Sequence, residues 1–422
     1  MTQNPSRRSF LRRVAGTAAF LPTAAATLGE LRPLLAAAPT GEAYWQMVRE
    51  QFAFREDKAP MNAGNLCPSP RAVAERVSEM TRDIDIDCSF NNRHKFWVEI
   101  EQTRSKLAGQ LGVTPDEIAL VRNTSEANNT VNNGISLKAG DEIVVWEQNH
   151  PTNNVAWDVR AARFGLKVQR VSLPANPSSA AQIVKIFDDA CTSKTKVLSV
   201  THVSSASGLR LPVREIGEAA HKRGLHYPVD GAQTWGALDV NLREMGCDSY
   251  AASSHKWFCG PKEAGLLYVK ADGITKIWPN IVAPGWGDDA DPDVNGARKF
   301  ESLGQRDDAC LSGVGTTSDF HKMIGPAKIE ARMMELATAL KAGLKSAGAK
   351  LVTPESAEFS GGIVIVDVPS KNRQTVLDRL YNEFGIAGST SGGLRLCPHF
   401  YNTMEHVERA VKGVKAMRDL LV

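Results

Sequence analysis

The sequence predicts an α/β fold in which a large domain with a mostly parallel, seven-stranded sheet carries a smaller C-terminal α+β domain. Between residues 118 and 269, short apolar runs alternate with helical patterns, as expected for parallel strands joined by crossover helices. Beyond residue 300 the pattern changes to long helices with few strands between them. The length of 422 residues is sufficient for two domains of this kind.

Seven strand-like runs account for the expected sheet. They cover residues 118–120, 142–146, 167–171, 197–202, 226–229, 249–252 and 265–269. Helical patterns before or between them cover 70–82, 94–112, 126–137, 152–164, 179–191 and 213–223. In open sheets of this type, ligands bind beyond the carboxyl ends of the strands, so polar residues at those ends are the first candidates for function.

The domain boundaries follow from the same patterns. We expect an N-terminal arm at residues 39–65, a large domain at 66–300 and a small C-terminal domain at 301–422. The arm begins with a short amphipathic helix at 42–58. The C-terminal domain contains a long helical pattern over 308–347, a strand at 362–368, a helix at 371–384, a strand before Arg395 and a last helix at 403–421.

The first 38 residues resemble a bacterial twin-arginine export signal. Arg7 and Arg8 precede Phe10 and Leu11, a mildly apolar stretch follows, and small residues end the segment at Ala38. This order predicts a periplasmic or otherwise exported bacterial protein that uses the twin-arginine translocation machinery. A disordered basic tail is the alternative.

Composition argues against several classes of partner. The net charge of +3 is too small for a nucleic-acid-binding or membrane-surface protein of this length. No apolar run reaches the roughly 20 residues that span a bilayer, so we expect no stable membrane anchor. The seven cysteines are widely spaced without a C-x-x-C pair, and we interpret most of them as buried apolar residues rather than metal ligands.

Two polar motifs follow successive strands. Asp230 begins D-G-A-Q after one strand, and Lys256 ends S-S-H-K after the next. The aspartate alone is equally consistent with a helix cap, and an isolated lysine is usually exposed to solvent. A lysine beyond a buried strand can instead have a lowered pKa and react with an aldehyde. The spacing of the two residues favours this second interpretation.

A third motif, R-N-T-S-E-A-N-N, follows the first strand and opens a helix. Thr124 and Ser125 would add hydroxyl donors to the free N–H groups of a helix N-terminus, which suits a phosphate. An ordinary capping sequence is the alternative. Phosphate donors, a reactive lysine and a buried carboxylate are together what pyridoxal phosphate requires.

With these motifs the chain resembles the class V aminotransferases of pyridoxal phosphate fold type I, a family that includes cysteine desulfurases and isopenicillin N epimerase. The resemblance extends from about residue 60 to the C-terminus. It implies that Lys256 binds the cofactor covalently, that Asp230 meets the pyridine nitrogen and that Gln233 lies near the phenolic oxygen. The residues implied for the phosphate are Thr124, Ser125, Ser253 and His255.

The resemblance also implies residues on the substrate side. His150, in E-Q-N-H-P-T-N-N, matches the ring that stacks on the cofactor, and Arg395, in L-R-L-C-P-H-F, matches the arginine that binds a substrate carboxylate. Further polar residues that relatives place near the substrate are Asn62, Asn91, Asn92 and Arg93. Because relatives build their sites across a subunit interface, a homodimer is expected.

Three departures from desulfurases narrow the interpretation. The segment G-I-A-G-S-T-S-G-G-L-R at 385–395 contains no cysteine, and Cys397 follows the arginine. Ser205 stands where desulfurases have asparagine, and Gln305 stands where relatives have a threonine that reaches the neighbouring subunit's phosphate. The short segment and the ending R-L-C-P-H-F-Y-N-T resemble the epimerase branch. The export signal adds a resemblance to the periplasmic member of that branch that tailors a pyoverdine.

The leading hypothesis is a pyridoxal-phosphate enzyme that acts on an amino group of a small amino acid or peptide-like substrate. Lys256 would remove the Cα proton, and return of the proton would give transamination or epimerisation. The first alternative is a C–S or β-lyase, including desulfurase-like activity. The second is a protein that keeps the fold without catalysis, although intact Lys256 and Asp230 argue against it.

Overall fold

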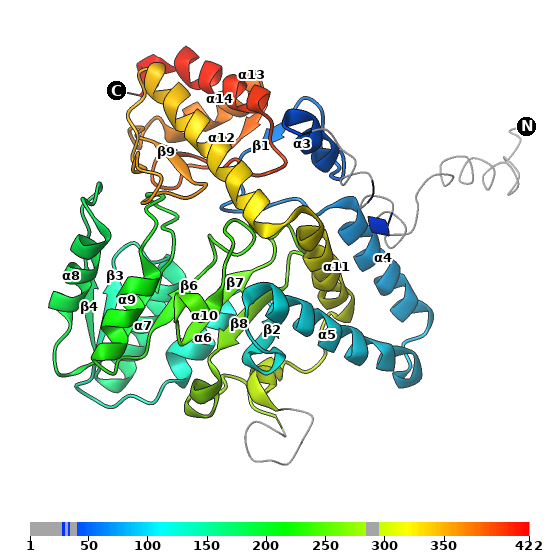
Figure 1. Cartoon of the computed structure of the whole chain (residues 1–422), viewed down its shortest axis with the longest axis vertical. Helices are drawn as coiled ribbons and strands as arrows, with labels where there is room; N and C mark the ends of the chain where they lie inside the picture. Colours follow the sequence, from blue (N-terminus) through cyan, green and yellow to red (C-terminus); the bar gives the residue numbers. More distant parts are fainter. Residues whose placement is uncertain (1–27, 30–32, 34–39, 284–294, 422) are drawn as a thin grey trace, which may run out of the picture.

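The fold is taken from a computed structural model, which describes residues 28–29, 33, 40–283 and 295–421. The twin-arginine motif and the proposed cleavage site after Ala38 lie outside the described residues. Within these ranges, the search for a helix long and apolar enough to cross a membrane found none. Figure 1 shows the large sheet below, the C-terminal helices above it and the N-terminal helices at one side.

The central sheet has seven strands in the order β2-β8-β7-β6-β5-β3-β4. The strands are β2 Ile118–Val121, β3 Glu142–Trp146, β4 Lys167–Val171, β5 Thr195–Thr201, β6 Pro228–Asp230, β7 Ser249–Ser253 and β8 Gly265–Val269. Strand β8 runs antiparallel to β2 and β7, whereas the remaining pairings are parallel. The prediction of a mostly parallel seven-stranded sheet is therefore confirmed.

Helices cover both faces of this sheet. They are α6 Thr124–Gly134, α7 Pro151–Phe164, α8 Ala180–Ala190, α9 Val213–Lys222 and the single turn α10 Leu242–Met245. Ala119 and Val121 of β2 pack with α6, while Ile118 and Leu120 face the main core that α8 and α9 complete. Successive side chains of a strand point to opposite faces, so apolar residues at every position allow burial on both sides.

A second core lies in the C-terminal unit. Its helices are α12 Pro326–Ser346, α13 Arg373–Phe384 and α14 Met404–Ala416, and its strands are β9 Val364–Val366, β10 Ile386–Ala387 and β11 Leu394–Leu396. The short strand β1, Ala59–Pro60, pairs in parallel with β10, and Met61 joins the same core. The end of the N-terminal arm is thus part of the C-terminal unit.

The long helix expected over 308–347 is in fact two helices, α11 Asp308–Ile324 and α12. Gly325 adopts a φ of 98° between them, and Pro326 begins α12. A positive φ favours glycine, while proline lacks the N–H that a continuous helix would need and fits the first turn of a new one. The arm helix is also shorter than expected, since α3 covers Glu42–Arg49.

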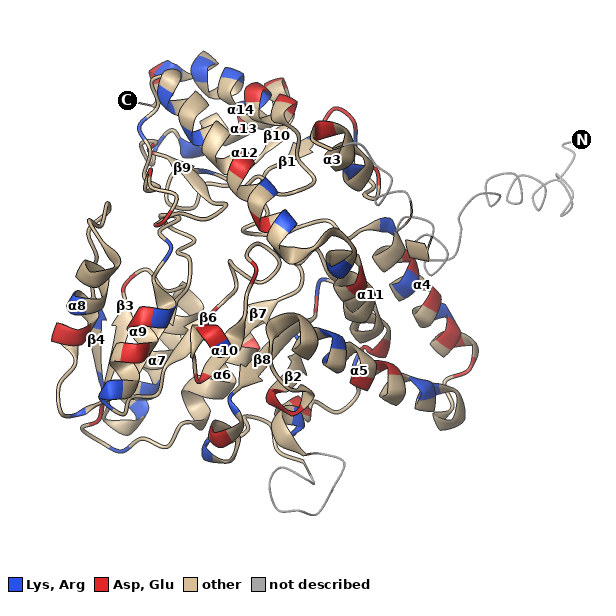
Figure 2. Cartoon of the chain, viewed as in Figure 1, with Lys and Arg blue, Asp and Glu red and all other residues tan. Residues whose placement is uncertain are grey.

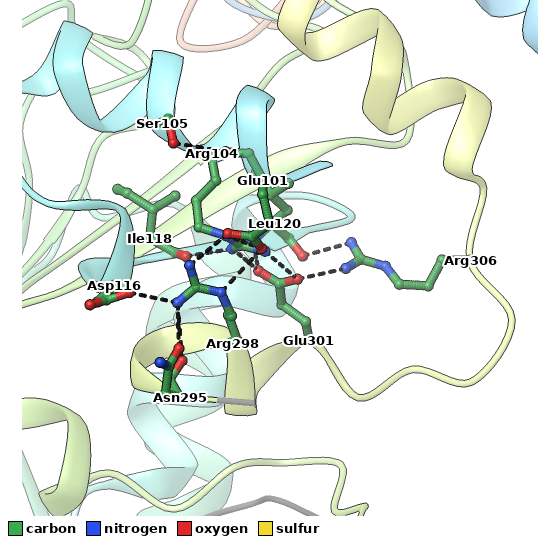
Figure 3. A network of polar contacts seen from close by, with 10 residues as sticks. All are labelled: Glu101, Arg104, Ser105, Asp116, Ile118, Leu120, Asn295, Arg298, Glu301 and Arg306. Carbon is green, nitrogen blue, oxygen red and sulfur yellow. Dashed lines mark hydrogen bonds and ion pairs between the residues drawn. The ribbon is translucent and has the colours of Figure 1, made fainter. Parts of the chain in front are cut away.

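Helix α11 packs against α4, Arg71–Ile86, and α5, Phe90–Leu111, which extend from the side of the sheet. A network of charges fixes α5 to the short helix η3, Gly296–Glu301 (Figure 3). Arg104 of α5 is 1% exposed, and its guanidinium pairs with the carboxylates of Glu101 and Glu301. Glu301 also accepts a hydrogen bond from the Leu120 N–H at 2.6 Å. The charge of this buried arginine is therefore compensated.

The outer surface carries both signs of charge. Figure 2 shows acidic and basic residues interspersed along α4, α5, α9 and α12. Exposed ion pairs are typical of this surface, for example Lys106 of α5 with Asp319 of α11 at 2.6 Å. Such pairs contribute little to stability because water screens them.

Candidate active site

The polar residues singled out from the sequence follow strands that end at one edge of the sheet. Asp230 is the last residue of β6, and Lys256 lies just beyond the end of β7. His150 lies between β3 and α7, and Thr124 lies between β2 and the rest of α6. Since these strands point the same way, their carboxyl ends bring the four residues to one side of the large domain.

Lys256 occupies a turn, in which the Cys259 N–H donates to the Lys256 carbonyl at 2.9 Å. Burial lowers the pKa of Lys256, the carboxylate of Asp230 opposes this shift, and the guanidinium of Arg395 adds to it. The three charged groups therefore lie within electrostatic reach of one another. Among the described residues, the Lys256 amine has neither a hydrogen-bond partner nor an ion-pair partner.

Asp230 is 2% exposed and its carboxylate is held by hydrogen bonds alone. Asn128 Nδ2 donates to Oδ2 at 2.8 Å, and the Ala232 N–H donates to Oδ1 at 2.9 Å. Asn128 is a site residue that our sequence reasoning missed. It stands four residues after Thr124 on α6, hence on the same helix face, and that spacing was the available signal.

Gln233 is fixed by two contacts rather than free to move. Its Nε2 donates to the Gly64 carbonyl at 3.0 Å, and Trp257 Nε1 donates to its Oε1 at 2.8 Å. A side chain at Gly64 would bring its Cβ within 3.1 Å of Gln233 Oε1 and within 3.7 Å of Arg395 Cζ. The arm therefore approaches the site so closely that a side chain at Gly64 would have to displace Gln233 or Cys397 slightly, and neither Gly64 nor Trp257 was singled out from the sequence.

The residues expected around a phosphate lie in three places. Thr124 and Ser253 join the start of α6 to the end of β7, because the Thr124 N–H and hydroxyl both contact Ser253 Oγ, at 2.8 and 2.7 Å. Ser125 lines a cavity of about 420 Å³ together with Arg122 and Asn129. His255 has a buried Nδ1 without a partner in the described structure.

Arg395, in the middle of β11, is 5% exposed. Its Nε donates to Ser389 Oγ at 3.0 Å, and its Nη1 donates to the Ser205 carbonyl at 3.1 Å. Ser205 thus acts here through its backbone. Within the described ranges, no carboxylate pairs with this guanidinium, and Nη2 has no protein acceptor. A buried positive charge without a counter-ion is costly, which favours an anionic ligand at this position.

His150 caps α7, where its Nδ1 lies 2.8 Å from Thr152 Oγ1, and its side chain is otherwise exposed. Desolvation lowers the pKa of His150, and the charge of Lys256 lowers it further, so the two side chains lie within electrostatic reach of each other. Asn62 lies next to Cys397 through a backbone bridge, and its Oδ1 is buried without a partner among the described residues.

The remaining predicted residues lie elsewhere. Arg93 Nη2 donates to Gln305 Oε1 at 3.0 Å and pairs with Asp308 at 3.4 Å, so these residues form one group near the start of α11. Asn92 Nδ2 donates to Asp83 Oδ2 at 3.0 Å, which ties α5 to α4. Within the described chain, no hydrogen bond or ion pair joins this group to Lys256, so the structure does not bring it into the cluster.

The cluster suits pyridoxal phosphate on the evidence of its unsatisfied groups. Lys256 has a free amine for a covalent bond, and no described cation pairs with the buried Asp230 carboxylate, which could therefore accept a hydrogen bond from a protonated ring nitrogen. The orphaned nitrogen of His255 and the hydroxyls of Thr124 and Ser253 are the polar groups available to a phosphate.

The family model described as Aminotransferase class-V matches residues 69–413. The chain belongs to this family. Pyridoxal phosphate is the family's cofactor, so the cofactor and the fold type I class predicted from the sequence are confirmed.

Known relatives span nearly the whole chain. Isopenicillin N epimerase of Streptomyces clavuligerus is 30% identical over 390 residues, which are 88% of this chain and 98% of that protein. A probable cysteine desulfurase of Methanothermobacter thermautotrophicus is 27% identical over 385 residues, 86% of this chain and 95% of that one. The solved cysteine desulfurase of Thermococcus onnurineus NA1 superposes with a TM-score of 0.78 at 23% identity, covering 88% of this chain and 97% of that structure.

Proposed function

We propose that this chain is an enzyme that removes the Cα proton of a substrate carrying both an amino group and a carboxylate, with transamination or epimerisation as the outcome. The observation that carries the proposal is Arg395, a buried guanidinium without a carboxylate partner in the described structure. Ser389 and Ser205 hold the guanidinium and leave Nη2 for the ligand. A substrate carboxylate there would form charge-assisted hydrogen bonds.

Lys256 is proposed as the base. Its desolvated position lowers the pKa, which increases the fraction of neutral amine at physiological pH and so its capacity to accept a proton. When bound, pyridoxal phosphate supplies the electron sink for the negative charge that develops at Cα. Asp230 and Asn128 hold one end of that site, and His150 covers the side from which α7 begins.

A desulfurase-like or β-lyase activity is the alternative, favoured by the desulfurase relatives. The persulfide route needs a reactive thiol, and the segment between β10 and β11 contains none. Cys397 is fully buried, and burial raises its pKa, so the thiolate is disfavoured. Both observations support the amino-group chemistry. A non-catalytic protein is a weaker candidate because Lys256 and Asp230 are both present.

The first experiment is a visible spectrum of the purified protein. We expect an absorbance band from the lysine-linked cofactor that borohydride reduction abolishes. Lys256→Ala should lack the band and the activity, while Lys262→Ala, an exposed lysine six residues along the chain, should keep both. A band that persists in Lys256→Ala, or no band in wild-type protein supplied with the cofactor, would refute the assignment of Lys256.

A second experiment determines the reaction. Candidate amino acids and short amino-acid derivatives are screened for loss of the visible band, and products of those that react are analysed. A keto acid indicates transamination and an inverted stereocentre indicates epimerisation. Release of sulfide with pyruvate from cysteine would establish the lyase alternative and contradict the proposal.

We also propose a homodimer, supported by an apolar surface on the extension formed by α4 and α5. Its exposed side chains are Ile86, Phe90, Trp97 and Val98. They adjoin a cavity of about 480 Å³ that Arg93 and Asp308 help to line. Phe90→Asp should lower the molar mass measured by light scattering, whereas Val159→Asp on α7 should not. A monomeric wild-type protein contradicts this proposal.

The export proposal rests on the sequence of residues 1–38. Replacing Arg7 and Arg8 by lysine should retain the protein in the cytoplasm of the expressing bacterium, while the same exchange at Arg12 and Arg13 serves as the matched control. Cell fractionation distinguishes the outcomes. Export of the first variant at the wild-type level would show that Arg7 and Arg8 are not part of an export signal.

A further inference from the structure

A buried cluster of soft ligand atoms lies directly behind the Lys256 turn. Cys67, Cys259 and His399 are each fully or nearly fully buried, and one potential ligand atom of each lies within 4.8 Å of the others. The three residues come from the segment between the arm and α4, from the Lys256 turn and from the segment after β11. Neither the cofactor chemistry nor the substrate proposal uses any of them.

His399 has the hydrogen-bonding pattern of a metal ligand. Its Nε2 lies 2.6 Å from the Trp257 carbonyl, an acceptor, so Nε2 carries the proton and donates it. The lone pair is then on Nδ1, which is buried and has no partner in the described chain. Metal-binding histidines commonly donate their second ring N–H to a backbone carbonyl, which fixes the tautomer and the ring orientation.

The cysteines also carry signs of a site. Cys259 has a φ of 58°, in the left-handed region that is unfavourable for residues other than glycine. Strained backbone of this kind persists where the surrounding structure requires it and is concentrated at functional sites. Cys67 Sγ lies 3.3 Å from the Tyr401 hydroxyl, and the Cys259 thiol donates to the Trp257 carbonyl at 3.6 Å. The two thiols and a ring nitrogen of His399 thus form one compact buried group, with the Tyr401 hydroxyl beside Cys67.

We propose that Cys67, Cys259 and His399 bind one Zn²⁺ ion, with the Tyr401 hydroxyl facing the fourth position. Binding would release two protons to solvent, one from each thiol, and form two Zn–S bonds and one Zn–N bond. Two thiolates and a dication sum to zero charge, which suits a fully buried site better than a charged complex would. Thiolate and imidazole ligands bind zinc in preference to calcium or magnesium.

The site would act as a positioning device for Lys256. The Cys67 N–H donates to the His255 carbonyl at 2.7 Å, and the Cys259 N–H donates to the Lys256 carbonyl at 2.9 Å. Two of the three ligands are therefore attached by their own backbone to Lys256 and to the residue before it. A metal ion would connect the segment that follows the arm, the Lys256 turn and the C-terminal unit at one point.

The test is the metal content of untagged holoenzyme from cells grown with added zinc, measured by elemental analysis after dialysis. We expect about one zinc per chain, as for a single structural site. Cys67→Ser, Cys259→Ser and His399→Gln should each lose most of it. Cys247→Ser, which removes a buried cysteine outside the cluster, should retain it. Wild-type protein without zinc, or unchanged zinc in the cysteine variants, would overturn the proposal.

A second measurement uses only wild-type protein, so it tests the site even if the variants fail to fold. Wild-type holoenzyme is treated with a thiol-alkylating reagent under mild denaturation, with and without zinc, and the modified cysteines are identified by mass spectrometry. Zinc should protect Cys67 and Cys259 selectively while leaving Cys247 unaffected. Equal labelling of all three, or a disulfide between Cys67 and Cys259 that excludes zinc, contradicts the site.

Discussion

Two buried arginines in this protein have opposite surroundings. Arg104, on α5, is enclosed by carboxylates, with Glu301 and Glu101 both in contact (Figure 3). Arg395, on β11, is almost as buried but contacts only a serine hydroxyl and a backbone carbonyl within the described structure. The first arginine satisfies its charge inside the fold, whereas the second is held in position with its charge uncompensated.

The contrast indicates which buried charges support the fold and which serve a ligand. Removing a partner from a satisfied pair leaves an uncompensated ion, so the cost falls on stability. An arginine that already lacks a partner carries that cost in the native protein, and a ligand carboxylate would relieve it. Arg332 resembles Arg104, since it is buried and pairs with the carboxylates of Glu42 and Glu335.

The largest effect is expected for Glu301→Gln, which removes the main counter-ion of Arg104. The free energy of unfolding should fall by about 3 kcal/mol, because the guanidinium stays buried with Glu101 as its remaining carboxylate partner. Urea denaturation measures this loss, while the visible band and the turnover of the folded enzyme should be unchanged. A loss below about 1 kcal/mol would mean that the network in Figure 3 does not compensate the charge.

Arg395→Lys should instead lower the catalytic efficiency more than the stability. The value of kcat/KM for a carboxylate-bearing substrate should fall about 10- to 100-fold, since an ammonium cannot reproduce the guanidinium fork. The free energy of unfolding should fall by no more than about 1–2 kcal/mol, because hydrogen bonds to Ser389 and Ser205 are weakened but no internal ion pair is broken. Steady-state kinetics and urea denaturation on the same preparation provide both numbers, and a large loss of stability would place Arg395 with the structural arginines.

A smaller effect is expected at Lys256 in the cofactor-free protein. The pKa of Lys256 is lower in the folded chain than in the unfolded chain, so between these two pKa values only the unfolded chain keeps the proton. The free energy of unfolding of the wild type therefore rises with pH from the lowered pKa to about 10.4. Lys256→Met should therefore be more stable than wild type at pH 7, by about 1 kcal/mol, and lack this rise. Equal pH dependence in both proteins would contradict the desolvation of the amine.

The smallest effect is expected on the surface of α5. Asp319→Asn breaks the exposed pair with Lys106, on the same helix as Arg104, and should change the free energy of unfolding by less than about 0.5 kcal/mol. The change should shrink further in high salt. A loss comparable to that of Glu301→Gln would show that burial does not separate the two kinds of pair.

Local sequence patterns were sufficient to predict the sheet. All seven strands are present, and all except the largely exposed β4 are apolar runs buried on both faces, which produce a signal within a few residues. The break at Gly325 was missed although the glycine and the proline stand in the sequence, since the helical period continues on both sides of it. Strand β1 could not be found, because two residues gain their structure only from β10, far along the chain.

The site shows the same division. Asp230 and Lys256 were recognisable because each follows a strand, and strand ends meet at one edge of the sheet. Asn128 was recoverable from helix spacing alone. Gly64 and Trp257, which hold Gln233, depend on the arm crossing the site, and no local pattern encodes that crossing.

The pairing of β1 with β10 limits how early this protein can complete its fold during translation. Ala59 leaves the ribosome early and Ile386 near the end, so β1 cannot pair with β10 until almost all of the polypeptide is synthesised. Arg395 emerges later still. The cofactor site is therefore completed only after translation is nearly over, and a truncated chain lacking the last strands would leave the arm without a place to dock.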